Sequence, residues 1–293
     1  MSKSSKKIFS TKYGSAFRAD SLYFMQKNIK DESVDLIMTS PPFPLLRKKK
    51  YGNEDQDKYL DWICSFFTDF YRILKPSGSL VIDLGGSWIK GQPTRSLYQF
   101  ELVIRACREF DFHLAQEFFW WNTAKLPSPA QWVNIERSRV KDAVNYVWWL
   151  SKSPKPKSDN RKVLWDYSES MHKLFERGYN KEDRPSEHKI SEVFDRDNKG
   201  SIPPNFLAIP NTRVDKKYQD YCKKNNLPIH PARFPKELPE FFIKLLTDEG
   251  DLIYDPFAGS CVTGYVSEKN SRKWICSDIE EDYIKGAKGR FIS

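Results

Sequence analysis

Several patterns that define common classes of protein are missing from this sequence. No apolar run in its 293 residues approaches the about 20 residues that cross a bilayer. Residues 1–7 are rich in serine and lysine and no apolar stretch follows them, so we expect neither a signal peptide nor a membrane segment. The five cysteines form no Cys-x-x-Cys pair, which argues against a zinc ribbon and a disulfide framework. Reduced thiols are typical of the cytoplasm, where we expect this protein.

Glycine-rich phosphate-binding patterns and clustered metal ligands are also absent. The chain contains neither G-x-G-x-x-G nor G-x-x-x-x-G-K-[ST], the patterns that bind dinucleotides and nucleoside triphosphates. His113, His172 and His188 have no metal-ligand spacing. We therefore expect no metal site.

Basic and aromatic residues, by contrast, are abundant. The chain has 48 Lys and Arg against 39 Asp and Glu, a net charge of +9, and its aromatic content is 15% with nine Trp. A basic surface suits a polyanionic partner, and aromatic rings either fill a core or stack on bases. Charge alone does not identify the partner, because many basic proteins bind no polyanion.

Strand and helix patterns alternate through most of the chain. Runs of apolar and β-branched residues predict strands at 34–38 and 79–84, and the chain must leave the sheet at Pro41 and Pro42. The other expected elements are helices 60–74, 97–110, 238–246, 262–268 and 282–290, and strands 112–121, 143–150, 252–254 and 273–277. This alternation predicts an α/β fold with a doubly wound, mostly parallel sheet.

Residues 151–225 interrupt the alternation. This stretch is rich in Lys, Asp, Ser, Pro and Asn and has little periodicity. A structureless loop of this length is improbable inside a compact fold, so a small inserted module is the better interpretation. The insert divides the chain into an N-terminal part, 1–150, and a C-terminal part, 226–293.

One candidate site lies in the C-terminal part. Asp255-Pro256-Phe257-Ala258-Gly259-Ser260 follows a predicted strand and precedes a helix, and Asp278 ends the next strand. Small residues allow close approach of a ligand, the free N–H groups of a helix start suit a carboxylate, and an acid after the next strand can bind ribose hydroxyls. With only Gly259 in the loop, a nucleoside without phosphates, such as S-adenosylmethionine, fits best. The alternative is an ordinary turn with an incidental acid.

A second candidate site, Ser40-Pro41-Pro42-Phe43, follows the strand predicted at 34–38. Methyl transfer to an exocyclic amine needs acceptors for the amine N–H groups, and Ser40 and Pro41 offer a hydroxyl and carbonyls on a turn stiffened by prolines. Phe43 can stack on the base. The alternative is a proline kink with Phe43 in the core. None of the five cysteines follows a proline, as the nucleophile of a cytosine C5-methylating enzyme would.

The Ser40 motif precedes the Asp255 motif along the chain. In this order, the two motifs resemble those of the amino-directed DNA methyltransferases of restriction-modification systems, in their permuted β-class arrangement. The resemblance implies a Rossmann-like methyltransferase sheet with a circularly permuted motif order and S-adenosylmethionine as cofactor. It also implies a catalytic half at 1–150, a target-recognition insert at 151–225 and a cofactor-binding half at 226–293. Serine at position 40 matches the branch that methylates cytosine N4, whereas adenine-N6 enzymes usually carry Asp there, so adenine-N6 methylation is the alternative.

The resemblance also implies further site residues. His230 and Pro231 match the motif near the cofactor's methionine part, Asp20 the acid near its adenine, and Asp278 the ribose acid. Many relatives have Gly, and some Asn, where this chain has Cys261. That difference is either a tolerated variation or an oxidation-sensitive thiol at a helix start.

Double-stranded DNA is the implied partner, with the target base flipped out of the helix. Arg47, Lys48, Lys49 and Lys50 follow the serine turn and suit phosphate contacts, the alternative being a solvated basic loop. The insert would read bases in the major groove. A separately acting restriction endonuclease and a monomer or weak dimer are compatible with this resemblance. Two other functions stay open, amino methylation of RNA or protein glutamine and DNA binding without catalysis.

Overall fold

The computed structural model of the chain describes residues 4–44, 56–177, 198–212 and 215–292. These residues form two compact units. One, the small unit, comprises Asp159–Pro204, and the other, the sheet unit, contains the rest of the chain.

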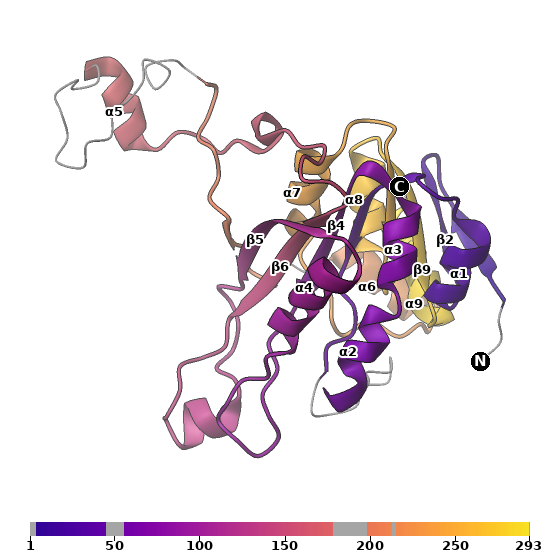
Figure 1. Cartoon of the computed structure of the whole chain (residues 1–293), viewed down its shortest axis with the longest axis horizontal. Helices are drawn as coiled ribbons and strands as arrows, with labels where there is room; N and C mark the ends of the chain where they lie inside the picture. The colour runs from indigo at the N-terminus through magenta and orange to yellow at the C-terminus, as the bar shows by residue number, and fades with distance from the viewer. Residues whose placement is uncertain (1–3, 45–55, 178–197, 213–214, 293) are drawn as a thin grey trace. The chain divides into compact units, whose positions relative to one another are not determined.

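The described part of the sheet unit is built around a nine-stranded sheet (Figure 1). In spatial order its strands are β1 (Lys6–Ser10), β2 (Gly14–Arg18), β9 (Lys273–Asp278), β8 (Leu252–Asp255), β3 (Val34–Thr39), β4 (Leu74–Leu84), β6 (Val144–Ser151), β5 (His113–Trp121) and β7 (Phe206–Ala208). The pairs from β2 to β4 are parallel, as is β5 with β7, while β1 and β6 run antiparallel to their neighbours. The predicted doubly wound, mostly parallel sheet is thus confirmed.

The central strand β3 shows why this sequence forms a buried sheet. All six of its residues are buried, as is expected of a parallel strand covered on both faces. Its one acid, Asp35, pairs with Lys75 at 2.8 Å and accepts a hydrogen bond from the Leu252 N–H at 2.9 Å. A charge inside the strand is therefore tolerated because it is paired.

Helices cover both faces of the sheet. They are α1 (Ser21–Asn28), α2 (Gln56–Cys64), α3 (Phe67–Ile73), α4 (Tyr98–Glu109), α6 (Lys216–Lys224), α7 (Glu237–Leu246), α8 (Val262–Lys269) and α9 (Glu281–Ala287), followed by the short helix η4 (Lys288–Arg290). The β3-to-β4 and β8-to-β9 crossovers proceed in opposite directions along the sheet. Because such crossovers are right-handed, α2 and α3 lie on one face and α8 on the other, and α3 and α4 cover the near face in Figure 1.

The helix predicted at 60–74 is wrong in its continuity and its end. The chain forms α2 and α3 with a break between them, and β4 begins at Leu74 instead of 79. At the break, the Ser65 hydroxyl donates to the Trp62 carbonyl at 2.6 Å and competes with helical bonding. The apolar spacing continues across the break because both helices bury side chains in the same core. β1, β2 and α1 lie before residue 34, where no strand or helix was predicted.

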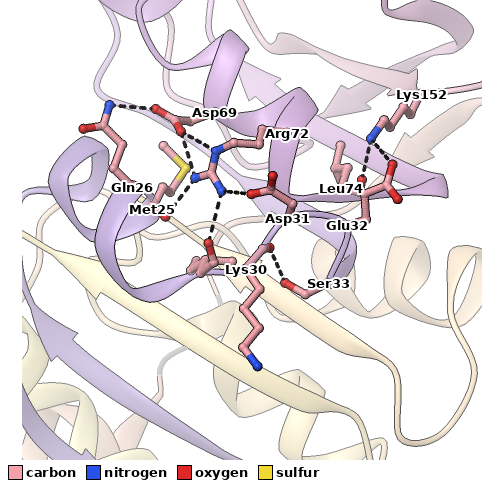
Figure 2. Close-up of polar contacts among 11 residues, drawn as sticks. Met25, Gln26, Lys30, Asp31, Glu32, Ser33, Asp69, Arg72, Leu74 and Lys152 are labelled. Carbon is pink, nitrogen blue, oxygen red and sulfur yellow. Dashed lines mark hydrogen bonds and ion pairs between the residues drawn. The ribbon is translucent and has the colours of Figure 1, made fainter.

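Ion pairs fix the amino ends of β3 and β4 (Figure 2). Arg72 of α3 donates to the Met25 and Ile29 carbonyls at the end of α1 and pairs with Asp31 and Asp69. Close by, Lys152 donates to the Leu74 carbonyl and pairs with Glu32. The carboxyl ends of these strands, at the opposite edge of the sheet, remain for a ligand.

The small unit contains a 3-10 helix, η2 (Asn160–Val163), helix α5 (Glu169–Arg177) and a bridge between Trp165 and Ser201. Within the range predicted as an insert, β7 pairs with β5 and α6 packs on α9 and η4, so both belong to the sheet unit. The assignment of 151–225 to target recognition stays a prediction. No helix in the described ranges is long and apolar enough to span a membrane.

Candidate functional site

The two sequence motifs meet where the sheet changes winding direction. β3 and β8 are adjacent, and their carboxyl ends carry the Ser40–Phe43 turn and the Asp255–Ser260 loop. The Thr39 hydroxyl donates to Asp255 Oδ1 at 2.7 Å and joins the two motifs directly. Open α/β sheets bind ligands at such a switch point.

Ser40 is oriented by residues from two other strands. Its hydroxyl donates to Asp83 Oδ2 of β4 at 3.0 Å, and Asn145 Nδ2 of β6 donates to Asp83 Oδ1 at 3.0 Å. Asp83 is only 1% exposed. Burial raises the pKa of its carboxyl group to about 6, an effect opposed by the two hydrogen bonds and by the positive charge of Lys125. A nearly neutral pKa allows this group to change protonation state under physiological conditions.

Sequence patterns did not identify Asp83 or Asn145 as site residues. The available signal for Asp83 was its position. It is an acid near the carboxyl end of the strand predicted at 79–84, which runs parallel to the strand that precedes Ser40. Asn145 gave no such signal, because its contact depends on the antiparallel register in which Asp83 faces Val147.

The rest of the turn is rigid and partly covered. Pro41 is buried and Pro42 is half-buried. The half-buried Phe43 ring packs so closely on Gly85 that a β-carbon there would lie 2.4 Å from it. Phe43 is thus fixed by the chain that follows β4.

Asp255 holds the second loop together. It is 1% exposed and accepts hydrogen bonds from the hydroxyls of Thr39 and Thr263, each at 2.7 Å, and from the Phe257 N–H at 3.1 Å. Burial raises its pKa to about 6, against these hydrogen bonds. Its oxygens are used within the protein, so Asp255 shapes the loop and joins it to α8. Ala258 and Ser260, which belong to the same loop, are also buried.

Gly259 lies between a carboxylate and an imidazole. Its N–H donates to Asp278 Oδ2 at 2.7 Å, and the Glu280 N–H donates to the other oxygen at 2.9 Å. Its φ is +48°, and a β-carbon would lie 2.8 Å from His230 Nε2, so only glycine fits. Burial raises the pKa of Asp278 to about 6 and lowers that of His230 to about 4. His230 is therefore neutral at pH 7, and its neighbour Pro231 is exposed.

A hollow of about 550 Å³ opens at the carboxyl end of β9, where Ile279, the residue after Asp278, contributes to its lining. Its lining is predominantly acidic and comprises Arg18, Asp20, Ile279, Glu280, Glu281, Asp282 and Lys285. Asp20 is held there as the N-cap of α1, with one oxygen accepting from the Tyr23 N–H at 2.9 Å. An acidic hollow of this volume suits a nucleoside that carries positive charge.

A buried arginine supports the loop from behind, and sequence patterns did not identify it. Arg290 donates to the Ser260 carbonyl at 2.7 Å and to its hydroxyl at 3.0 Å, and it pairs with Asp215. Its guanidinium lies 4.5 Å from the Tyr218 ring centroid, and the Tyr218 hydroxyl accepts from the His230 N–H at 2.9 Å. Ser260 and His230 are thus linked through α6 and η4.

Cys261 is fully buried at the start of α8 and has a φ of +52°. Glycine and asparagine adopt this left-handed conformation most readily. The buried position favours the interpretation as a tolerated variation. Arg47, Lys48, Lys49 and Lys50 lie outside the described residues.

Comparison with known proteins gives consistent matches over nearly the whole chain. A family model described as DNA methylase matches residues 34–289. The type II methyltransferase M.PvuII of Proteus hauseri is 49% identical over 290 residues, which cover 98% of this chain and 86% of that protein. M.HpaI of Haemophilus parainfluenzae is 26% identical, with 91% and 71% covered. The solved structure of the cytosine-N4-specific PvuII DNA methyltransferase aligns with a TM-score of 0.80 and 43% identity, covering 98% of this chain and 89% of that one.

Proposed function

The chain belongs to the DNA methylase family, and from this membership we propose a specific reaction. It transfers the methyl group of S-adenosylmethionine to the N4 amino group of cytosine, at a specific site in DNA, as the methyltransferase of a restriction-modification system. The observation that carries this proposal is the hydrogen bond between Ser40 and the buried Asp83, beside the Gly259 loop. The 49% identity to M.PvuII supports the choice of substrate.

The acidic hollow and the Gly259 loop fit the cofactor. S-adenosylmethionine supplies an electrophilic methyl group on a positively charged sulfur. We assign Asp278 and Asp20 as acceptors of hydrogen bonds from its hydroxyl and amino groups. The pKa of His230, about 4, keeps this side chain neutral beside the loop, so it does not repel the positively charged ligand.

The Ser40 turn activates the amine. The Ser40 hydroxyl donates a hydrogen bond to Asp83. The lone pairs of the hydroxyl oxygen are therefore free to accept a hydrogen bond from an amine N–H. The Pro41 carbonyl is a second acceptor on the same rigid turn. Both acceptors raise the electron density on the amine nitrogen and orient its lone pair. After methyl transfer, the surplus amine proton passes through Ser40 to Asp83, whose pKa of about 6 suits this role.

The DNA is double-stranded, and the target cytosine leaves the helix to reach Ser40. We assign base reading to the 151–225 insert and phosphate contacts to Arg47, Lys48, Lys49 and Lys50. We also infer that the enzyme acts in the cytoplasm as a monomer or weak dimer, and that a separate cognate endonuclease cuts the unmethylated site.

Transfer of tritium from labelled S-adenosylmethionine to duplex DNA tests the catalytic assignment. Ser40→Ala should lower the rate about 100- to 1000-fold, as expected for loss of an aligned acceptor, and should leave cofactor affinity unchanged. The matched control is Ser33→Ala, because Ser33 is a half-buried serine just before β3, at the opposite end of that strand, and its hydroxyl donates to the Lys30 carbonyl. Full activity of Ser40→Ala would overturn the assignment.

A further inference from the structure

Residues 122–143 form an arm of the sheet unit that extends away from the sheet between β5 and β6 (Figure 1). β5 runs parallel to β4, because both are antiparallel to β6. The arm therefore starts at the edge of the sheet that carries Ser40. Backbone hydrogen bonds hold its two sides together, from the Asn122 N–H to the Ala143 carbonyl and from the Asp142 N–H to the Ser128 carbonyl, each at 2.9 Å.

The root of the arm is anchored next to the catalytic turn. Asp142 pairs with Arg95 and accepts a hydrogen bond from Trp88 Nε1 at 2.9 Å, both from the segment that follows β4. Three residues further on, Asn145 contacts Asp83. At the other side of the root, the positive charge of Lys125 acts on the Asp83 carboxylate. The root of the arm is thus fixed close to Asp83, the partner of Ser40.

The surface of the arm is basic. It carries Lys125, Arg137, Arg139 and Lys141, and within the described part of the chain no carboxylate forms an ion pair with any of them. The acids are engaged differently, since Asp142 is used in the anchor and Glu136 accepts from Gln131 at 2.8 Å. Three of these cations, Arg137, Arg139 and Lys141, thus have no carboxylate partner among the described residues, which favours a polyanion as the ligand of this surface.

Exposed apolar side chains lie among these cations. Leu126 is 81% exposed, Ile135 70% and Val140 88%. Apolar side chains beside Lys and Arg are typical of surfaces that contact sugar edges or press between base steps, where the cations hold the phosphates.

We propose that the arm is a DNA-contacting element that holds the duplex beside the flipped cytosine, with Arg137, Arg139 and Lys141 on backbone phosphates. This inference rests on the proposed function, which supplies duplex DNA as the substrate. It adds a third DNA-contacting segment to the insert and the basic residues 47–50. The contacts are to phosphates and therefore independent of base sequence.

Fluorescence anisotropy tests the arm. The full-length triple variant Arg137→Gln/Arg139→Gln/Lys141→Gln and the wild type are titrated with a labelled duplex that the wild type methylates, across a range of salt concentrations and with S-adenosylhomocysteine bound. We expect the triple variant to bind at least tenfold more weakly. The slope of log K against log[salt] should fall by about 2–3, at about 0.9 per lost phosphate contact. A duplex of unrelated sequence should show the same loss.

The matched control neutralises Lys27, Lys30 and Arg108, which are exposed at the opposite edge of the sheet, and should leave both affinity and slope unchanged. Arg139→Gln alone, with a slope change of about 1, serves if the triple variant misfolds. A wild-type slope in the arm variants, or a loss confined to one sequence, overturns the arm proposal. A wild type that transfers no methyl to DNA overturns the proposed function instead.

Discussion

Asp83 determines what Ser40 can do. As a carboxylate, Asp83 accepts a hydrogen bond from the Ser40 hydroxyl. In the proposed mechanism, the lone pairs of the serine oxygen then remain for the substrate amine. Once protonated, Asp83 would itself donate to Ser40 and occupy a lone pair that the amine requires. Burial places the pKa of this switch at about 6, above the ordinary value of 3.8.

The rate of methyl transfer should therefore fall as the pH drops below about 6, because a carboxyl group with a raised pKa becomes protonated there. Asp83→Asn should lower kcat about 100-fold and abolish this pH transition. Single-turnover rates between pH 5 and pH 8, with both cofactor and DNA saturating, measure the effect. An unchanged transition in Asp83→Asn would show that another group titrates.

Backbone conformation and close packing against His230 both restrict position 259 to glycine. Gly259→Ala combines a positive φ with a β-carbon 2.8 Å from His230 Nε2, whereas Gly91→Ala has a positive φ but no atom within 4 Å. We expect both to lose about 1 kcal/mol of stability through strain. Only Gly259→Ala should also bind S-adenosylmethionine at least tenfold more weakly. Calorimetry of cofactor binding checks this, and equal affinity in the two variants would contradict the packing of His230 on the loop.

Short motifs pointed to Ser40, Gly259 and Asp278 because each lies at or shortly after the end of a strand that is readable from the sequence. Asp83, Asn145 and Arg290 are different. Their contacts join residues 43, 62 and 30 positions apart, respectively. No local pattern encodes such pairings, since they depend on the order and register of the strands and on where the C-terminal helices pack.

At the scale of secondary-structure elements, α6 and η4 support the Asp255–Ser260 loop. Arg290 fixes Ser260 while Tyr218 fixes the backbone of His230. Gly289 permits this packing, because a β-carbon there would lie 2.4 Å from the Tyr221 side chain. The loop is thus held on both sides of Gly259.

Arg290→Gln should raise the dissociation constant for S-adenosylmethionine about tenfold, equivalent to about 1.4 kcal/mol, with a smaller change in kcat. Arg290→Lys should recover part of the affinity. Arg272→Gln is the control, because Arg272 is equally buried, at 8% exposure, but bonds to Thr247 and Asn270. If Arg272→Gln weakens cofactor binding as much as Arg290→Gln does, the effect is general destabilisation and the positioning role is excluded.

Elements were predictable where apolar periodicity and length agreed. β3, β8, β9 and α7 matched their predicted ranges closely because buried runs or regular helical spacing define them. The break between α2 and α3 was missed because the apolar spacing continues across it, since both helices bury side chains in the same core. The hairpin β1–β2 and the three-residue strand β7 are too short, and too exposed, for periodicity to reveal them.

At the scale of the whole molecule, the fold followed from strand and helix alternation, and membership of the DNA methylase family agrees with it. Chain order places the Ser40–Phe43 turn first and the Asp255–Ser260 loop last, yet β3 and β8 are neighbours, so the two motifs meet at one switch point. Position in sequence could not show that α6 lies with the sheet unit, because its partners α9 and η4 come at the end of the chain.

The identity of the methylated base tests the central claim most directly. Duplex DNA incubated with the purified protein and S-adenosylmethionine is digested to nucleosides and analysed by mass spectrometry, with Ser40→Ala as the parallel sample. The proposed mechanism predicts N4-methylcytosine in the wild-type sample and its near absence with Ser40→Ala. N6-methyladenine in its place, or no methylated base at all, would contradict the assignment.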